Sequence, residues 1–334
     1  METIRYCGNK SKIIPKILDL IPKECKNILD AFSGTTSVSQ ALKINNYNVD
    51  CNDISYYSKV FGDTYIVNNN QYTSEKINYL NNLKLKKSWF YNNYNFLEKK
   101  PFSDLNLQKL DSIRNQIDII SENEMEKSIL LTSLINALDK VFNGIGHQVS
   151  YLRQFSKSSL KPLKLELPIF IEGKGSYNST QQDIFTIKKQ YDLIYLDAPY
   201  GTNNTQQTSR VRYNSYYHLW NTIVKNDKPK LFGKVGRPLS TKDSSISVFE
   251  STDIGVVYNS FVDLLELNTK YFIFSYSNKS KIQIQDLIKL FNKKLIKTLS
   301  FEHKENNQKN LITTSKYVID TNKNLEYLFL LKNN

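Results

Sequence analysis

Short apolar segments that each end near a polar or glycine residue recur along this chain, and segments with helical periodicity separate them. The four clearest strand-like segments, with the residue at or near which each ends, are 26–32 (Gly34), 47–52 (Asp53), 191–196 (Asp197) and 271–274 (Ser275). Residues 35–43 follow the first segment and open with hydroxyl residues that suit a helix start. This alternation predicts an α/β fold with a doubly wound, mostly parallel sheet. Ligands of such sheets bind beyond the carboxyl ends of the strands, so we expect a site there.

A long helical stretch interrupts the alternation. Residues 74–142 are predicted to be helical, and Ser121-Glu122-Asn123-Glu124 reads as a capping box before the last of these helices. Gly- and Pro-punctuated loop or hairpin sequence follows up to residue 180, and a last strand is expected at 327–331. We therefore expect one domain from residues 1–61 and 181–334, with residues 62–180 as an inserted, mainly helical subdomain.

The composition excludes several classes of protein. Of the 334 residues, 40% are hydrophobic and 23% are charged, which is typical of a globular protein and not of a disordered one. No apolar run approaches the roughly 20 residues of a membrane-spanning helix, and the N-terminal segment lacks the apolar core of a secretory signal. The three cysteines lie far apart and the three histidines are isolated, so we expect no disulfide framework and no metal site. A cytoplasmic protein without a membrane partner is expected.

The net charge of +13 is concentrated in two windows, because residues 141–165 carry +4 and residues 201–242 carry +7. Such clustering is expected of a surface that neutralises phosphates, although a solvated basic face would give the same pattern. The candidate nucleic-acid-binding residues in these windows are Asn143, His147, Arg153, Lys157, Lys161, Arg210, Arg212, Lys234 and Arg237.

The turn Phe32-Ser33-Gly34-Thr35-Thr36 lies between the first strand and its helix. Its single glycine supports a pyrophosphate cradle poorly, so a nucleoside without a diphosphate fits better. Asp53 lies 19 residues after Gly34, close to the spacing at which an acid meets a ribose hydroxyl. The alternative is an ordinary strand–helix turn with a surface aspartate.

The tetrad Asp197-Ala198-Pro199-Tyr200 follows an apolar strand. Proline cannot continue a strand ladder, so the chain turns there and its carbonyls point outward. A carboxylate, backbone carbonyls and an aromatic face together could accept both hydrogens of an amino group on a planar ring and stack on that ring. The alternative is a turn with Tyr200 packed in the core.

Taken in order, these motifs resemble the Dam-like, alpha-group DNA adenine-N6 methyltransferases, and the resemblance covers nearly the whole chain. An N-terminal segment at residues 5–12, the turn at Gly34, the acid Asp53, an insert and the tetrad match that family's order. Ala198 departs from the family, which usually has proline there, but alanine keeps the carbonyl that the position supplies. The resemblance implies a seven-stranded methyltransferase sheet and a target-recognition role for the insert.

The resemblance also implies S-adenosyl-L-methionine as cofactor and methyl transfer to the N6 amino group of adenine in duplex DNA, with base flipping. The residues that it implies for cofactor binding are Tyr6, Cys7, Gly8, Lys10, Phe32, Ser33, Gly34, Thr35, Thr36, Asp53, Asp183 and Asp197. It implies catalytic roles for Asp197, Ala198, Pro199 and Tyr200, and a place near the target base for Ser275 and Tyr276. Within 141–165, the donors suited to base edges in the major groove are Asn143, His147, Gln148, Arg153 and Gln154.

Double-stranded DNA is thus the expected partner, together with a cognate restriction endonuclease that acts on the same site, in a bacterial cytoplasm and at the nucleoid. Three alternatives remain open at this point. An RNA adenine-N6 methyltransferase would share fold and tetrad, and a catalytically weakened DNA-binding relative would retain the basic windows. A nicotinamide-dependent dehydrogenase is disfavoured by the missing second and third glycines.

Overall fold

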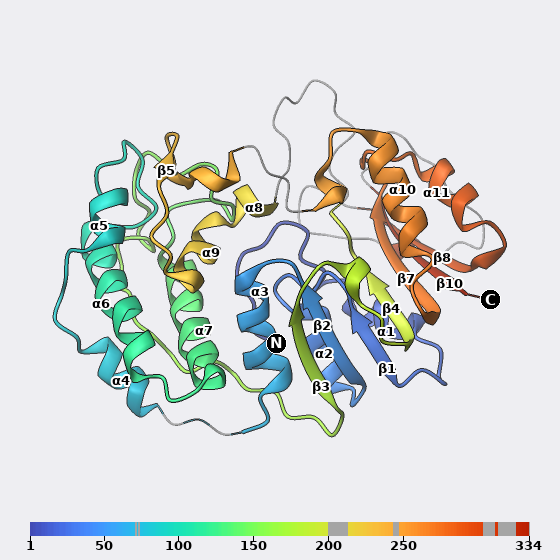
Figure 1. Cartoon of the computed structure of the whole chain (residues 1–334), viewed down its shortest axis with the longest axis horizontal. Coiled ribbons are helices and arrows are strands. Elements are labelled where there is room, and N and C mark those ends of the chain that lie inside the picture. The colour runs from blue at the N-terminus through green and yellow to red at the C-terminus, as the bar shows by residue number, and fades with distance from the viewer. Residues whose placement is uncertain are drawn as a thin grey trace.

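The computed structural model describes residues 1–70, 72, 74–199, 213–242, 247–302, 311–312 and 325–333, and in them the chain builds one large sheet (Figure 1). Its strand order is β3-β2-β1-β4-β7-β10-β8-β9. The strands are β1 (Asn27–Asp30), β2 (Asn48–Asp53), β3 (Tyr177–Gln181), β4 (Tyr191–Leu196), β7 (Thr269–Ser277), β8 (Leu295–Glu302), β9 (Leu311–Ile312) and β10 (Leu325–Lys332).

The sheet is mostly parallel. Strands β3, β2, β1, β4 and β7 pair in parallel, whereas β10 runs antiparallel to both β7 and β8. The predicted α/β sheet of seven strands is confirmed, and the two-residue strand β9 adds an eighth at one edge. The chain moves outward from β1 through β2 to β3 and then returns to β4 on the other side of β1. The strand order therefore reverses between β1 and β4, where α/β sheets bind their ligands.

Apolar side chains cover both faces of the sheet. Leu193 and Tyr195 face a cluster with α1 (Ile14–Leu20), α2 (Ser37–Ile44) and α3 (Tyr56–Phe61). Ile194 and Leu196 face the opposite cluster with α10 (Ile254–Leu264) and α11 (Ile284–Phe291). This alternation along β4 produces the predicted doubly wound arrangement, because successive side chains of a strand point to opposite faces.

A second body of helices lies beside the β3 edge of the sheet (Figure 1). We call it the helical lobe, and it contains α4 (Glu75–Asn81), α5 (Trp89–Tyr94), α6 (Asp104–Ile120) and α7 (Glu124–Val141). The chain enters it from α3 through the π-helix η1 (Gly62–Val67). The predicted helical character of residues 74–142 is confirmed.

The segment after the tetrad also packs on the helical lobe. It holds α8 (Tyr213–Tyr216), α9 (His218–Lys225) and a hairpin of β5 (Leu231–Phe232) and β6 (Arg237–Pro238). Arg114 of α6 is buried and donates from Nη2 to the Val224 carbonyl at the end of α9, at 2.9 Å. The Trp220 ring centroid lies 6.0 Å from that of Phe142. The expected domain division, which assigns these residues to the sheet domain, stays a prediction.

Two helix starts differ from those expected. Helix α7 is capped by Asn123, which accepts from the Glu126 N–H at 2.9 Å, and not by the predicted box at Ser121. Helix α2 receives no cap from its own hydroxyl opening; Asp30, at the end of β1, accepts from the Ser39 N–H at 3.1 Å. Four short helices complete the fold: η2 (Ile184–Thr186), η3 (Leu239–Thr241), η4 (Val248–Glu250) and η5 (Asn292–Lys294).

Membrane-spanning helices and metal sites can be assessed in the described part of the chain. None of its helices is long and apolar enough to cross a membrane. No group of three or more His, Cys, Asp or Glu side chains within it is arranged to hold a metal ion.

Candidate active site

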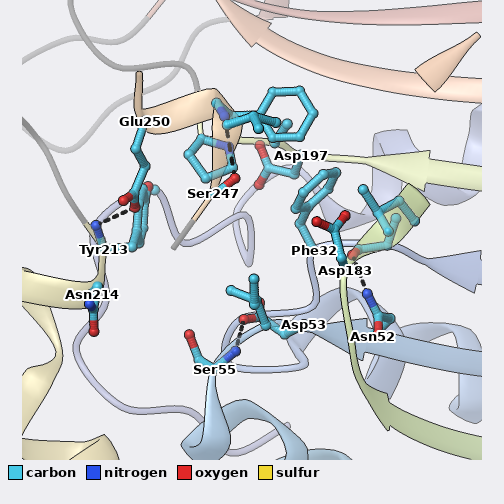
Figure 2. A pocket seen from close by; sticks show the side chains of 18 of the residues that line it. Phe32, Asn52, Asp53, Ser55, Asp183, Asp197, Tyr213, Asn214, Ser247 and Glu250 are labelled. Atoms are coloured by element: carbon cyan, nitrogen blue, oxygen red, sulfur yellow. Dashed lines mark hydrogen bonds between the residues drawn. The ribbon is translucent and has the colours of Figure 1, made fainter. Parts of the chain in front are cut away.

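A pocket opens at the carboxyl ends of β1, β2 and β4, where the strand order reverses. Its empty space is about 890 Å³, including the part open to solvent. Figure 2 shows side chains from several elements converging on it. Predicted site residues that line it are Tyr6, Cys7, Gly8, Lys10, Phe32, Asp53, Asp183, Asp197, Ala198 and Pro199.

The turn after β1 is held against the acid at the end of β2. The Gly34 N–H donates to Asp53 Oδ2 at 2.9 Å, and the Ser55 N–H donates to Asp53 Oδ1 at 2.8 Å. Gly34 has φ +49°, and a Cβ there would lie 3.3 Å from the Tyr6 ring, so the turn requires glycine. Burial raises the pKa of Asp53, while its backbone hydrogen bonds lower it. Asp53 is thus fixed at the pocket wall by the turn that precedes it in the sequence.

Four predicted cofactor residues lie behind the pocket wall and do not line it: Ser33, Gly34, Thr35 and Thr36. Ser33, Thr35 and Thr36 are buried, and Thr36 adopts φ +60° at the start of α2. The Gly34 carbonyl accepts from Ser58 Oγ at 2.6 Å. These residues shape the turn that presents Phe32 and Asp53, and their direct contact with a cofactor stays a prediction.

An ion pair joins the N-terminal segment to the tetrad. Lys10 Nζ lies 3.1 Å from Asp197 Oδ1, and 5% of the Lys10 side chain and 18% of the Asp197 side chain are exposed. Lys10 Nζ also donates to the Gly8 carbonyl at 3.2 Å. Burial raises the pKa of Asp197, and the charge of Lys10 lowers it. Lys10, which was expected to contact the cofactor, thus lies directly beside the predicted catalytic carboxylate.

Of the other tetrad residues, the structure describes Ala198 and Pro199. Ala198 is buried and packs with the hydrophobic cluster behind β4, and both Ala198 and Pro199 line the pocket. Tyr200 lies outside the described residues. Ser275 is buried inside β7, which continues to Ser277, so the expectation that it ends a strand is wrong. Its hydroxyl nevertheless faces the tetrad, because hydrogen bonding from Ser275 lowers the pKa of Asp197.

Part of the pocket wall had no signal in the sequence. Glu250 Oε1 accepts from the Tyr213 N–H at 2.7 Å, which joins η4 to α8 at one side of the pocket (Figure 2). Other lining residues that the sequence analysis missed are Asn52, Ser55, Asn214, Ser247, Val248 and Phe249. Only Asn52 and Ser55 had a usable signal, since they flank Asp53 at the end of a predicted strand.

The predicted DNA-binding residues divide into exposed and buried ones. Arg153, Gln154, Lys157, Lys161 and Lys234 are exposed, and His147 and Arg237 are partly buried. Asn143 is buried, and its amide donates to the Lys100 and Leu152 carbonyls, both at 3.0 Å. Gln148 is buried as well. The structure therefore corrects the expectation that Asn143 and Gln148 present free donors to base edges. Arg210 and Arg212 lie outside the described residues.

Comparison with known proteins gives one family. Residues 6–273 match the model of the D12 class N6 adenine-specific DNA methyltransferases, which is most of the chain. The Type II methyltransferase M.NlaIII of Neisseria lactamica is 29% identical over 279 residues, covering 80% of this chain and 80% of its own length.

Two further relatives are longer proteins. The modification methylase LlaI of Lactococcus lactis subsp. lactis is 26% identical and covers 86% of this chain and 48% of its own length. The Type II methyltransferase M.FokI of Planomicrobium okeanokoites is 26% identical and covers 86% of this chain and 47% of its own length. The chain thus spans about half the length of these two relatives. A solved magnesium protoporphyrin IX methyltransferase from Synechocystis with bound SAM is similar only at TM-score 0.30 and 8% identity, over 96% of this chain and 75% of that one.

Proposed function

The chain belongs to the D12 class of N6 adenine-specific DNA methyltransferases, and from this premise we propose that it methylates the N6 amino group of adenine at a specific sequence in duplex DNA. S-adenosyl-L-methionine is the proposed methyl donor. The observation that carries the proposal is the meeting of Asp53, Asp197 and the carbonyl-bearing turn at Ala198 and Pro199 around one pocket.

The pocket suits this cofactor chemically. S-adenosyl-L-methionine carries a sulfonium and an ammonium group, and the pocket lining contains the carboxyl groups of Asp53, Asp183, Asp197 and Glu250 against one lysine. We assign Asp53 to the ribose hydroxyls and Asp183 to the adenine of the cofactor. Asp183 is exposed and already accepts from the Phe185 N–H at 3.1 Å, so its carboxylate is oriented before any ligand binds. Tyr6, Cys7, Gly8 and Phe32 supply the walls.

The chemistry depends on hydrogen-bond acceptors at the end of β4. When bound, the cofactor supplies a methyl group on a positively charged sulfur. The adenine amino nitrogen is a poor nucleophile because its lone pair is delocalised into the ring. Asp197 and the Ala198 carbonyl accept its two hydrogens, which frees the lone pair for in-line attack on the methyl carbon. As the nitrogen–carbon bond forms, the carbon–sulfur bond would break to leave a neutral thioether, and the nitrogen would lose one of its two protons to solvent. Lys10 keeps the Asp197 carboxylate ionised and oriented, and Tyr200 stacks on the adenine after it leaves the duplex.

The helical lobe is the proposed target-recognition part. Exposed basic residues at 153–161, which follow α7 in the sequence, and Lys234 of the hairpin that packs on the lobe would bind phosphates. Arg210 and Arg212, which follow the tetrad in the sequence, would add to them. A restriction endonuclease with the same target site is the proposed partner, since the relatives include modification methylases. The proposed location is the bacterial cytoplasm, at the nucleoid.

Methyl transfer to DNA tests the proposal. The wild type should incorporate radiolabelled methyl groups into adenine-containing duplexes, and sequencing of the methylated adenines should return one target string. A protein that is folded but labels no such duplex would contradict the enzyme assignment. Preferential labelling of ribosomal RNA over DNA in direct competition would favour the RNA alternative.

Asp197→Ala is the decisive variant because it removes the acceptor oxygens of the side chain. We expect kcat to fall by roughly 10²–10³-fold, as for loss of one preorganised electrostatic contact, while the cofactor Kd changes only a few-fold. Asp19→Ala, at an exposed carboxylate of α1, is the matched control and should retain full activity. Wild-type rates in Asp197→Ala would rule out the proposed role of this residue.

A further inference from the structure

An exposed isoleucine stands at the tip of the loop that follows α7. The Ile145 side chain is 71% exposed, although Phe142 and Asn143 before it and Gln148 after it are buried. Glycines flank it on both sides, and Gly146 has φ +102°, in the region that favours glycine. Single exposed apolar residues are common on protein surfaces, so exposure alone does not indicate a role. The contacts of this loop and its position beside the pocket do indicate one.

The loop is fastened on both sides of its tip. On one side, Arg5 Nη1 donates to the Gly144 carbonyl at 3.1 Å. On the other, the Gln148 N–H donates to the Tyr216 carbonyl at 2.8 Å, and Gln148 Oε1 accepts from the Leu219 N–H at 2.7 Å. These contacts hold the backbone at both ends of the loop, whereas the Ile145 side chain between them is largely exposed.

The same contacts place the loop beside the active-site pocket. Arg5 immediately precedes Tyr6 and Cys7, which line the pocket. The Cys7 N–H donates to Tyr217 Oη at 2.7 Å, next to Tyr216, on which the loop is anchored. The tip of the loop is therefore connected to the pocket wall through directly bonded neighbours on either side.

We propose that Ile145 is an apolar wedge that enters the base stack of the duplex and occupies the space that the target adenine leaves. This inference rests on the proposed function and adds a positioning residue to it. Proteins that unstack DNA commonly insert an apolar side chain between base steps. Isoleucine suits this task because its β-branched side chain is stiff and loses little rotational freedom on insertion.

The test compares Ile145→Ala with the wild type on two duplexes that carry the methylated sequence. In one, the target adenine is paired with thymine; in the other, it faces an abasic site, which removes the pairing that a wedge helps to break. We expect kcat/KM of the variant to fall roughly tenfold on the paired duplex. On the abasic duplex the variant should remain within about twofold of the wild type. A 2-aminopurine at the target position should show weaker fluorescence enhancement with the variant on the paired duplex.

Ile119→Ala is the matched control, because Ile119 is 73% exposed at the end of α6. It should behave as the wild type on both duplexes. Equal activity of Ile145→Ala and wild type on the paired duplex would overturn the wedge, and so would an equal loss on both duplexes. If the wild type methylates neither duplex, the proposed function fails, and the wedge fails with it.

Discussion

At the scale of single residues, the local motifs identified the chemistry and tertiary packing supplied the rest of the pocket. Asp53 and Asp197 were predictable because each lies at the end of a predicted strand, and parallel strands bring such ends to one edge of the sheet. Glu250 and Asn214 were not predictable, since they reach the pocket only through the packing of η4 and α8. The ion pair between Lys10 and Asp197 was likewise invisible in the sequence, because 187 positions separate its partners.

Asp30 is a buried acid at the end of β1, and its pKa is raised. Its Oδ2 accepts from Ser39 N–H and Oγ, whereas Oδ1 is buried and has no hydrogen-bond partner within the described ranges. Burial raises the pKa of Asp30 to about 7, against the opposing effect of the Ser39 hydrogen bond. The native state therefore binds more protons than the unfolded state between about pH 4 and pH 7. Stability due to this group is present at acidic pH and is lost as pH rises through that window.

Asp30→Asn should remove the loss of stability that the wild type shows as the pH rises, since an amide carries no charge to bury. We compare the free energy of unfolding of the variant with that of the wild type at each pH. The variant's value minus the wild-type value should be about 2–4 kcal/mol larger at pH 8 than at pH 4.5, because only the wild type loses stability as the pH rises. Urea denaturation of both proteins at the two pH values measures the difference. An identical effect of the substitution at both pH values would show that Asp30 does not titrate in this range.

At the scale of elements, the strands β3 and β8 were not predicted. Strand β3 has the sequence YNSTQ and lay in a region predicted as loop or hairpin. Among the strands that the structure describes, it pairs only with β2, at the sheet edge, so it needs no continuous apolar run. Helix α9 was not predicted either, because residues 201–242 were considered only as a basic window; its buried side chains pack on the helical lobe.

The entry into the helical lobe depends on one buried lysine. Lys43 of α2 is fully buried, and its Nζ donates to the carbonyls of Ile66 at 2.7 Å, Asn68 at 2.8 Å and Tyr65 at 3.3 Å. These carbonyls belong to the end of η1 and the residue just beyond it, and a π-helix leaves its last carbonyls without partners in the helix. Burial lowers the pKa of Lys43 to about 8, which still leaves it mostly protonated at pH 7.

Lys43→Met should therefore leave three buried carbonyls without donors. We expect the free energy of unfolding to fall by roughly 2–4 kcal/mol, because a buried unsatisfied polar group is costly. Lys16→Met, at an exposed lysine of α1, is the matched control and should change it by less than about 0.5 kcal/mol. Urea denaturation at pH 7 distinguishes the two. An unchanged midpoint for Lys43→Met would mean that water replaces the ammonium group.

At the scale of the whole molecule, charge is distributed unevenly between the two parts. Lys157 and Lys161 are exposed in the segment that follows α7, within a window of residues that carries no acid. Lysines that contact phosphates release counterions, so their contribution to DNA affinity depends steeply on salt. This is the measurable signature of the proposed binding surface.

Charge reversal at Lys157 and Lys161 should weaken DNA binding at every sequence and lower the slope of log Kd against log salt concentration by about 2. Reversal of Lys289 and Lys297, exposed lysines of α11 and β8, is the control and should leave that slope unchanged. Fluorescence anisotropy titrations over a salt series provide both slopes. A loss confined to one DNA sequence would make Lys157 and Lys161 readers of bases instead.

The larger hydrophobic cluster runs without interruption from one face of the sheet through α3 into the helical lobe and α9. Exchange of the whole lobe with that of another methyltransferase would therefore cut through a shared interior and expose apolar surface on both pieces. A new DNA target is more readily engineered by grafting surface loops, such as residues 149–161, onto an unchanged interior. In this protein, the DNA target can therefore be changed at the surface without loss of folding, whereas a change that reaches the shared interior would also affect folding.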